Sequence, residues 1–233
     1  CMSANNETGA VLPIDTLKLL ITAANSPALL HVDATQSFGK YPIYPKACGI
    51  DLMTFSSHKI HGPKGVGALY KSKSVRILPI LHGGEQQGGL RPGTEPTVLI
   101  AGFAAAVRDI GNMAENESRV RKLRDYIAER LMQIDGAVMN SPNDSSAYVL
   151  NISLPGFKSE TLLHYLDSRG ICVSSGSACS KGKQSHVLTA LGFDKKRADS
   201  ALRISFSKYN TIDEADLLIN SISDAVKTLI RVK

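Results

Sequence analysis

The sequence predicts an α/β protein of two lobes joined by a long helix. Three apolar runs, at residues 28–33, 51–56 and 66–71, are continuous rather than alternating, which is typical of buried strands in a mostly parallel sheet. A long helical pattern, from about residue 97 to 133, separates these runs from a second set of strand and helix patterns. Two α/β units on either side of one helix indicate two lobes.

The predicted elements alternate along the chain. A short helical pattern at residues 17–24 begins after Pro13 and Asp15, which are typical of a helix start. The second and third apolar runs are separated by a loop at 57–65 that is rich in glycine, proline and polar side chains, and a further glycine-rich loop is expected at 83–94. After the long helix we expect, in order, a turn at 142–146, a strand at 148–153, a helix at 159–169, a strand at 171–174, a glycine- and serine-rich loop, a helix near 187–191, a strand at 201–205 and a helix from Ile212 onward.

The composition argues against several classes of protein. The chain has 233 residues, of which 43% are hydrophobic and 21% charged, the balance of an ordinary soluble globular protein. The net charge of +6 is scattered and tryptophan is absent, so we expect no nucleic-acid partner. No apolar run approaches the roughly 20 residues that span a bilayer, so we expect no membrane association. None of the four cysteines forms a Cys-x-x-Cys pair, which disfavours a metal site and fits a reducing cytoplasm.

Asp33 stands where the first apolar run ends. Ligands of open α/β sheets bind beyond the carboxyl ends of the strands, so this acid is a candidate binding residue. Its alternative role is to cap the turn that follows.

Lys59 follows the end of the second apolar run, within Ser56-Ser57-His58-Lys59. A lysine just beyond a buried strand can reach a pocket above the sheet, where desolvation lowers its pKa and makes it a candidate for covalent attachment to a carbonyl compound. Its alternative is an ordinary solvated lysine. Ser56 and His58 supply donors suited to a phosphate, and the glycines that follow allow the backbone to approach closely. An acid, a lysine and a phosphate-binding loop on adjacent strand ends match the needs of pyridoxal phosphate.

Cys179 lies in a loop of small residues, Ser174–Lys183, with lysines directly after it. Nearby positive charge favours the thiolate, the nucleophilic form of cysteine. Cys172 stands between Ile171 and Val173 in a predicted strand, and we interpret it as an inert core thiol. Cys48 is also interpreted as structural.

Arg203 lies inside the apolar run Leu202–Phe206. An arginine in such a place needs an acidic partner. Two readings are open at this point: an internal salt bridge, or a clamp that binds the carboxylate of a substrate through two parallel hydrogen bonds.

Five segments of the chain together resemble the group I cysteine desulfurases (the NifS/IscS type) of the class V aminotransferase family. Their order and spacing carry the resemblance, and they extend over nearly the whole chain. The segments are Ala4–Gly9, His31–Gln36, Ser56–Gly65, Arg91–Glu95 and Ser174–Cys179. The stretch Ser-Ser-Gly-Ser-Ala-Cys favours group I over the other group, which carries arginine and histidine before its cysteine.

The resemblance implies a homodimeric pyridoxal phosphate enzyme of fold type I that converts L-cysteine to L-alanine and leaves a persulfide on the enzyme. Lys59 is then the Schiff-base lysine, and Cys179 is the thiol that receives the sulfur. The resemblance also implies that Asp33 pairs with the ring nitrogen, that Gln36 forms a hydrogen bond to the ring oxygen, and that Ser56 and His58 bind the phosphate. Thr94 then contacts the phosphate in the neighbouring subunit. Asn6 and Arg203 contact the ring or the substrate carboxylate.

Family members carry a substantial segment ahead of the Asn-Asn-Glu motif, so the resemblance implies that this chain lacks the first part of the large domain. The expected domains are the C-terminal part of the large cofactor-binding domain at residues 1–96, a connecting helix at 97–135, and a small α+β domain with the cysteine loop at 136–233.

Two other functions are weighed against cysteine desulfuration. An aminotransferase of the same fold would share Asp33 and Lys59 but would not need a thiol in a serine- and glycine-rich loop. A non-catalytic fragment that binds a partner would retain only the small lobe. For the desulfurase we expect a cytoplasmic location and a sulfur-acceptor protein such as an iron–sulfur scaffold.

Overall fold

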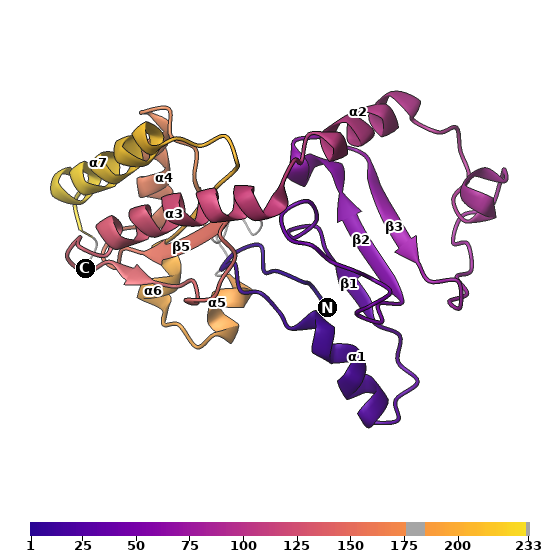
Figure 1. Ribbon diagram of the computed structural model, residues 1–233. Coiled ribbons are helices and arrows are strands. Elements are labelled where there is room, and N and C mark those ends of the chain that lie inside the picture. The colour runs from indigo at the N-terminus through magenta and orange to yellow at the C-terminus, as the bar shows by residue number, and fades with distance from the viewer. Residues whose placement is uncertain (176–184, 232–233) are drawn as a thin grey trace. The chain divides into compact units, whose positions relative to one another are not determined.

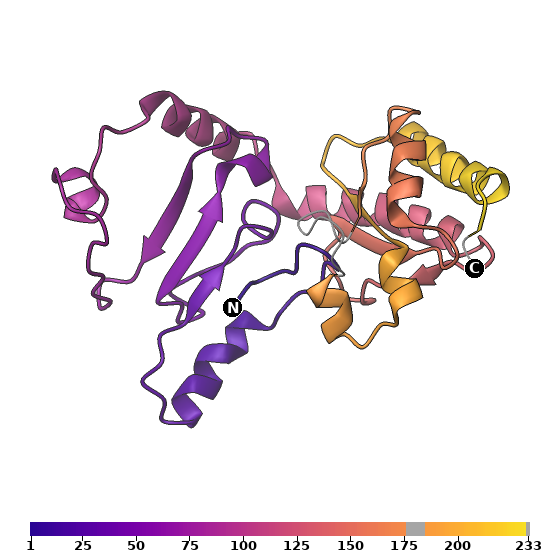
Figure 2. The same cartoon turned by 180° about the vertical axis from the view of Figure 1, so that it is seen from behind.

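A computed structural model describes residues 1–175 and 185–231 of the chain. The chain divides into two compact units, whose elements are drawn in Figures 1 and 2. Unit 1 comprises Cys1–Ala4 and Leu12–Met113, and unit 2 comprises Asn5–Val11 and Ala114–Lys233. The short segment Asn5–Val11 therefore belongs to unit 2 although the residues on both sides of it belong to unit 1.

Unit 1 is built on a sheet of three strands in the order β1 (His31–Asp33), β2 (Leu52–Ser56) and β3 (Gly67–Lys71). Strands β1 and β2 are parallel, and Met2 adds a parallel bridge to Asp33 on the other side of β1. Strand β3 is antiparallel to β2, and three of its five residues are exposed. The sequence pattern had suggested a third buried parallel strand. The connection from β2 is too short for the crossover of a dozen or more residues that a parallel neighbour needs.

Two groups of apolar side chains stabilise unit 1. Leu30, Val32 and Met53 lie in the first group, against which helix α1 (Ile14–Ala23) packs with Ile14, Leu17 and Ile21. The second group joins Ile60 to Phe103 of helix α2 (Thr97–Arg108). The rings of Phe38 and Phe55 stack beside it with their centroids 4.2 Å apart. These contacts fix the short 3₁₀ helix η1 (Ser57–Ile60), which begins directly where β2 ends.

The expected single helix from residue 97 to 133 is wrong, because the structure has two helices there. Helix α2 ends at Arg108 and α3 runs from Met113 to Leu131. Gly111 between them has a φ of 69°, a left-handed conformation that glycine adopts easily and that ends a helix. The domain boundaries expected at residues 96 and 135 stay a prediction. Among the described residues no single helix has both the length and the apolar character to cross a membrane, although α2 and α3 together would meet that test as a bent pair.

Unit 2 contains an antiparallel sheet in the order β4 (Val138–Met139), β5 (Val149–Ser153), β7 (Ala201–Ser205) and β6 (Ser174–Ser175). All five residues of β5 are buried, because helices cover the sheet on both sides. Helices α4 (Ser159–Asp167) and α7 (Ile212–Thr228) lie on one side of β5, and the short helices α5 (His186–Ala190) and α6 (Lys195–Asp199) lie on the other (Figures 1 and 2). Neither α6, β4 nor the 3₁₀ helix η2 (Gln86–Gly89) was expected from the sequence.

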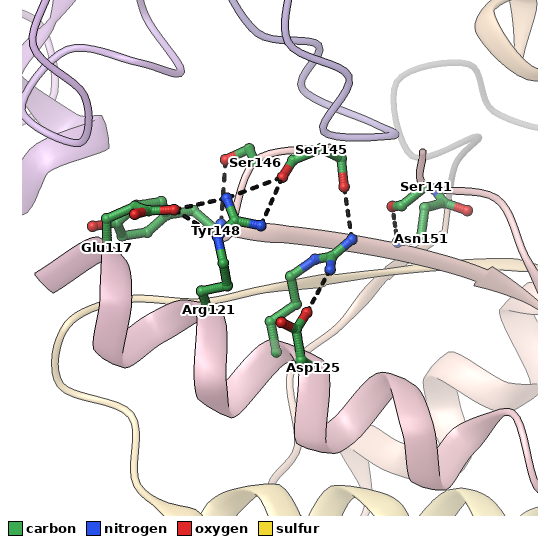
Figure 3. Close-up of polar contacts among 9 residues, drawn as sticks. Glu117, Arg121, Asp125, Ser141, Ser145, Ser146, Tyr148 and Asn151 are labelled. Carbon is green, nitrogen blue, oxygen red and sulfur yellow. Dashed lines mark hydrogen bonds and ion pairs between the residues drawn. The ribbon is translucent and has the colours of Figure 1, made fainter. Parts of the chain in front are cut away.

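Helix α3 is fixed to the loop that leads into β5 by two arginines (Figure 3). The buried Arg124 donates to the Ser145 hydroxyl at 2.7 Å and pairs with Asp125 at 2.8 Å. Arg121 pairs with Glu117 one turn earlier. The same loop then holds the segment Asn5–Val11, because the amide of Ser146 donates to the carbonyl of Gly9 at 2.8 Å.

This arrangement strongly favours glycine at position 9. Its φ is 76°, and a Cβ placed on it would lie 3.1 Å from the carbonyl oxygen of Val149. The Asn-Asn-Glu-Thr-Gly motif is therefore seated directly against strand β5 of unit 2.

Candidate active site

One group of candidate residues lies at one edge of the sheet of unit 1. Strands β1 and β2 are parallel, so their carboxyl ends, at Asp33 and Ser56, lie at the same edge. Asp33 pairs in register with Thr54, and Ser56 lies on the same face as Thr54 because side chains alternate along a strand. Asp33 and Ser56 thus share one face and one edge of the sheet.

Asp33 also caps the turn that follows it. Its Oδ1 accepts the amide N–H of Thr35 at 2.8 Å, which turns the chain toward the half-buried Gln36. Both readings of this residue from the sequence are therefore compatible: the carboxylate shapes the turn, and it remains exposed at the edge where a ligand would bind.

Lys59 is positioned by its buried neighbours. Ser57 and Ile60 of η1 are buried, and Ile60 belongs to the apolar group around Phe103. A Cβ at Gly62 would collide with the Ser57 hydroxyl, so the chain closes tightly after the lysine. Lys59 itself is half-buried, whereas His58 and Thr94 are exposed. The turn thus fixes the backbone on both sides of the lysine and leaves the adjacent His58 open to solvent.

Lys40 also lies at this site, although no pattern in the sequence predicted it there. Burial and the charge of Lys59 together lower the pKa of Lys40 to about 8. Two lysines whose charges interact create a local positive potential that suits an anionic, phosphate-bearing ligand. The only sequence signal was a lysine among apolar residues, four positions after Gln36.

The lowered pKa of Lys40 predicts that the free energy of unfolding changes with pH in the alkaline range. Because the pKa of Lys40 is lower in the folded than in the unfolded chain, the unfolded chain binds more protons between about pH 8 and 10.5. The stability of wild type relative to Lys40→Met should therefore rise by on the order of 3 kcal/mol over this interval, since one pKa unit corresponds to about 1.4 kcal/mol. Denaturant unfolding of both proteins from pH 7 to 10.5 measures this difference.

The matched control for this prediction is Lys46→Met, which removes an exposed lysine six residues away. Its stability difference from wild type should stay constant with pH. A constant difference for Lys40→Met as well would contradict a buried charge at that position.

A separate group of candidate residues lies in unit 2 around Arg203. The guanidinium donates from Nη1 to the carbonyl of Asn6 at 3.0 Å and from Nη2 to the hydroxyl of Ser174 at 3.1 Å. Within the described residues its Nε is buried without a hydrogen-bond partner, and no carboxylate lies within ion-pair distance. The internal salt bridge, one of the two readings left open by the sequence, is thus not found among the described residues. Neutral partners leave the positive charge of Arg203 uncompensated by direct contact, which favours the carboxylate clamp.

Asn6 contributes its backbone carbonyl to Arg203, and its side chain is exposed. The neighbouring Glu7, to which the sequence analysis gave no role, is buried with 6% of its surface exposed. Burial raises the pKa of Glu7, while the hydroxyl of Ser185 and the charges of Arg203 and His186 lower it. A buried acid beside the arginine could not be read from the sequence, because it requires residues 7, 185 and 203 to meet.

The cysteines need one correction. Cys179 lies outside the described residues. Cys172 was interpreted as a core thiol, but it is exposed and precedes the strand, since β6 begins only at Ser174. It lines a cavity of about 280 Å³ together with Ile171 and Val173. The half-buried Cys48 packs against the first apolar group of unit 1, as a structural residue would.

Comparison with known proteins identifies the family. A sequence model of the aminotransferase class-V family matches residues 1–218. The chain belongs to this family. A cysteine desulfurase of Trichormus variabilis is 38% identical over 98% of this chain, and a putative cysteine desulfurase, IscS 1, of Bacillus subtilis is 39% identical over the same share. The mitochondrial cysteine desulfurase of Saccharomyces cerevisiae is 37% identical.

Solved structures agree with the predicted fold type I architecture. A NifS-like protein matches 98% of this chain with a TM-score of 0.90 at 37% identity, and a NifS-like protein of Rickettsia africae matches with 0.89 at 32%. The chain spans 58% and 61% of the two bacterial relatives and 46% of the yeast protein. It spans 60% and 61% of the two structures. The predicted membership of the class V aminotransferase family and the predicted fold type I architecture are confirmed.

Class V aminotransferases depend on pyridoxal phosphate, and the residues of unit 1 fit that cofactor. The sheet edge offers an acid for a ring nitrogen, Lys59 for an aldehyde, and the positive charge of Lys40 for a phosphate. Within the described residues the buried hydroxyl of Ser57 also lacks a hydrogen-bond partner. This set of donors and charges is the one that such a cofactor requires.

Proposed function

We propose that this chain carries the lysine, arginine and thiol of a cysteine desulfurase that converts L-cysteine to L-alanine and holds the sulfur as a persulfide on Cys179. One observation carries the proposal. Asp33 and Ser56 lie at the same edge of the unit 1 sheet, and Lys59 follows Ser56 in the turn η1. The names of the relatives, which match 98% of the chain, support the choice of substrate.

In the proposed site, pyridoxal phosphate would be held by Asp33, Gln36, Ser56, His58 and Lys59, and when bound it supplies an electron sink. Asp33 keeps a proton on the ring nitrogen, and Lys59 moves the proton at the α-carbon of the substrate.

Arg203 binds the substrate carboxylate, with Asn6 beside it, and so orients the β-carbon and its sulfur. The Cys179 thiolate attacks that sulfur. A sulfur–sulfur bond forms as the carbon–sulfur bond breaks, and the electron pair of the broken bond stays with carbon, which takes a proton to give alanine. The sulfur of the substrate is then the outer atom of the persulfide on Cys179.

The partners follow from the same proposal. We expect a homodimer in which Thr94 reaches the phosphate bound by the neighbouring subunit. We also expect a sulfur-acceptor protein, such as an iron–sulfur scaffold, in the cytoplasm.

The decisive assay compares two reactions of the purified chain supplied with pyridoxal phosphate. Release of alanine from L-cysteine supports a desulfurase, with sulfide appearing when a thiol reductant such as dithiothreitol is present to reduce the persulfide. Exchange of an amino group with a keto acid, without release of sulfide, would instead support an aminotransferase of the same fold. Absence of cofactor absorbance together with binding to an iron–sulfur scaffold protein would support the non-catalytic, partner-binding function.

A further inference from the structure

Glu7 is a buried acid that the proposed reaction does not use. It lies in the segment Asn5–Val11, which is fixed to unit 2 by its backbone. The side-chain amide of Asn151 donates to the carbonyl of Glu7 at 3.0 Å. Since Asn151 is itself fully buried in β5, the position of Glu7 is set by the core of unit 2.

One oxygen of the Glu7 carboxylate is held by Ser185. The hydroxyl of Ser185 donates to Oε2 at 2.7 Å, and the same hydroxyl oxygen accepts the amide of Leu188 at 3.2 Å as the cap of helix α5. Ser185 is 5% exposed, so this bond is shielded from water. The other oxygen, Oε1, is buried and has no hydrogen-bond partner among the described residues.

The charged groups that act on Glu7 are Arg203 and His186. Both favour its ionised form, whereas burial opposes ionisation and has the larger effect on the pKa. Arg203 has only neutral hydrogen-bond partners within the described residues, so Glu7 is the buried acid whose charge it feels. Burial of a carboxylate in this place costs desolvation energy. If residue 7 had only a structural role, a neutral side chain of similar volume would avoid that cost.

We propose that Glu7 is a positioning residue for Arg203: Ser185 fixes the Glu7 carboxylate, and the carboxylate orients the guanidinium that binds the carboxylate of the substrate. This inference rests on the proposed function, because it assigns Arg203 to substrate binding. No ion pair joins the two side chains among the described residues, but the two residues are neighbours: Nη1 of Arg203 donates to the carbonyl of Asn6, next to Glu7. Arg203 also lies opposite Asn151 in the sheet, and Asn151 donates to the carbonyl of Glu7. The buried Nε of Arg203 and Oε1 of Glu7 have no hydrogen-bond partner in the described part of the chain, so the charge of Glu7 acts on the guanidinium without direct contact.

The test compares Glu7→Gln, Ser185→Ala and the double variant, with Glu160→Gln as the matched control. Glu7→Gln keeps the shape and an acceptor for Ser185 but removes the charge. Glu160 is an exposed acid in the first turn of α4, so its substitution makes the same chemical change away from the site. Steady-state kinetics with L-cysteine and the ¹⁵N NMR signal of the Arg203 Nε–H group, assigned by its loss in Arg203→Lys, are both measured.

For Glu7→Gln we expect the KM for L-cysteine to rise about tenfold with little change in kcat, the factor for loss of one interaction with a charged group. The Arg203 signal should shift in the same variant. Ser185→Ala should produce a smaller change of the same kind, and the double variant should resemble Glu7→Gln, because the two residues act in series. Glu160→Gln should change neither readout.

A Glu7→Gln variant with unchanged KM and an unchanged Arg203 signal, altered only in its melting temperature, would overturn the proposal. If wild type itself releases no alanine from L-cysteine, the proposed function fails, and the NMR signal then decides the orienting role alone. A shift in both Glu7→Gln and Ser185→Ala supports that role, and an unshifted signal in Glu7→Gln overturns it.

Discussion

Replacement of Lys59 by alanine is expected to lower the rate of alanine formation from L-cysteine by about 10²–10⁴-fold, the usual contribution of a group that transfers a proton in the transition state. The turn η1 holds this lysine at the end of β2, beside the edge that carries Asp33 and Ser56. The same change should remove the visible absorbance that distinguishes lysine-bound cofactor from the free aldehyde. Absorbance spectra and steady-state rates measure the two effects independently.

Lys64→Ala is the matched control for this change. Lys64 is an exposed lysine five residues further along the same loop. We expect its replacement to leave the spectrum and the rate within about twofold of wild type, as is usual for exposed positions. A Lys59→Ala protein with the wild-type spectrum would exclude Lys59 as the cofactor lysine.

Replacement of Cys179 by alanine should abolish sulfur transfer while leaving the absorbance of the bound cofactor intact. Without this thiolate nothing attacks the substrate sulfur, so the carbon–sulfur bond has no acceptor for its sulfur atom. After incubation with L-cysteine, the wild-type peptide that contains residue 179 should be heavier by one sulfur atom. The variant peptide should have its original mass, and alanine should form at the uncatalysed rate.

Cys172→Ala separates the role of Cys179 from general thiol chemistry, since it removes a different thiol that is exposed to solvent. It should retain the wild-type rate and the sulfur on residue 179. Alanine formation at the wild-type rate in Cys179→Ala would refute the role of that cysteine.

The fold could be predicted where local pattern and tertiary structure agree. Strand β7 was predicted at its observed bounds, and helix α7 begins at the expected Ile212, where Thr211 and Glu214 form a capping box. The direction of β3 was not predictable from its apolar composition, because direction depends on the length of the connection. The break between α2 and α3 depended on one glycine, Gly111, within a sequence that is otherwise continuously helical in character.

The candidate site was predictable in part, namely where its residues directly follow an apolar run in the sequence. Asp33 and Lys59 follow apolar runs directly, so their place at strand ends can be read from the sequence. Lys40 and Glu7 could not be found in this way, because their properties arise from burial and from charges on residues distant in sequence. The neutral partners of Arg203 likewise appear only when β7, β6 and the segment at Asn6 are brought together.

The most direct test of the account locates the cofactor on the chain. Borohydride reduction of the protein loaded with pyridoxal phosphate fixes the cofactor permanently to the lysine that holds it, and peptide mass mapping then identifies that residue. The account predicts the cofactor on Lys59. Attachment of the cofactor to Lys40 would contradict this prediction. Lys40 is the main competing amine, because its lowered pKa leaves more of it in the uncharged, reactive form.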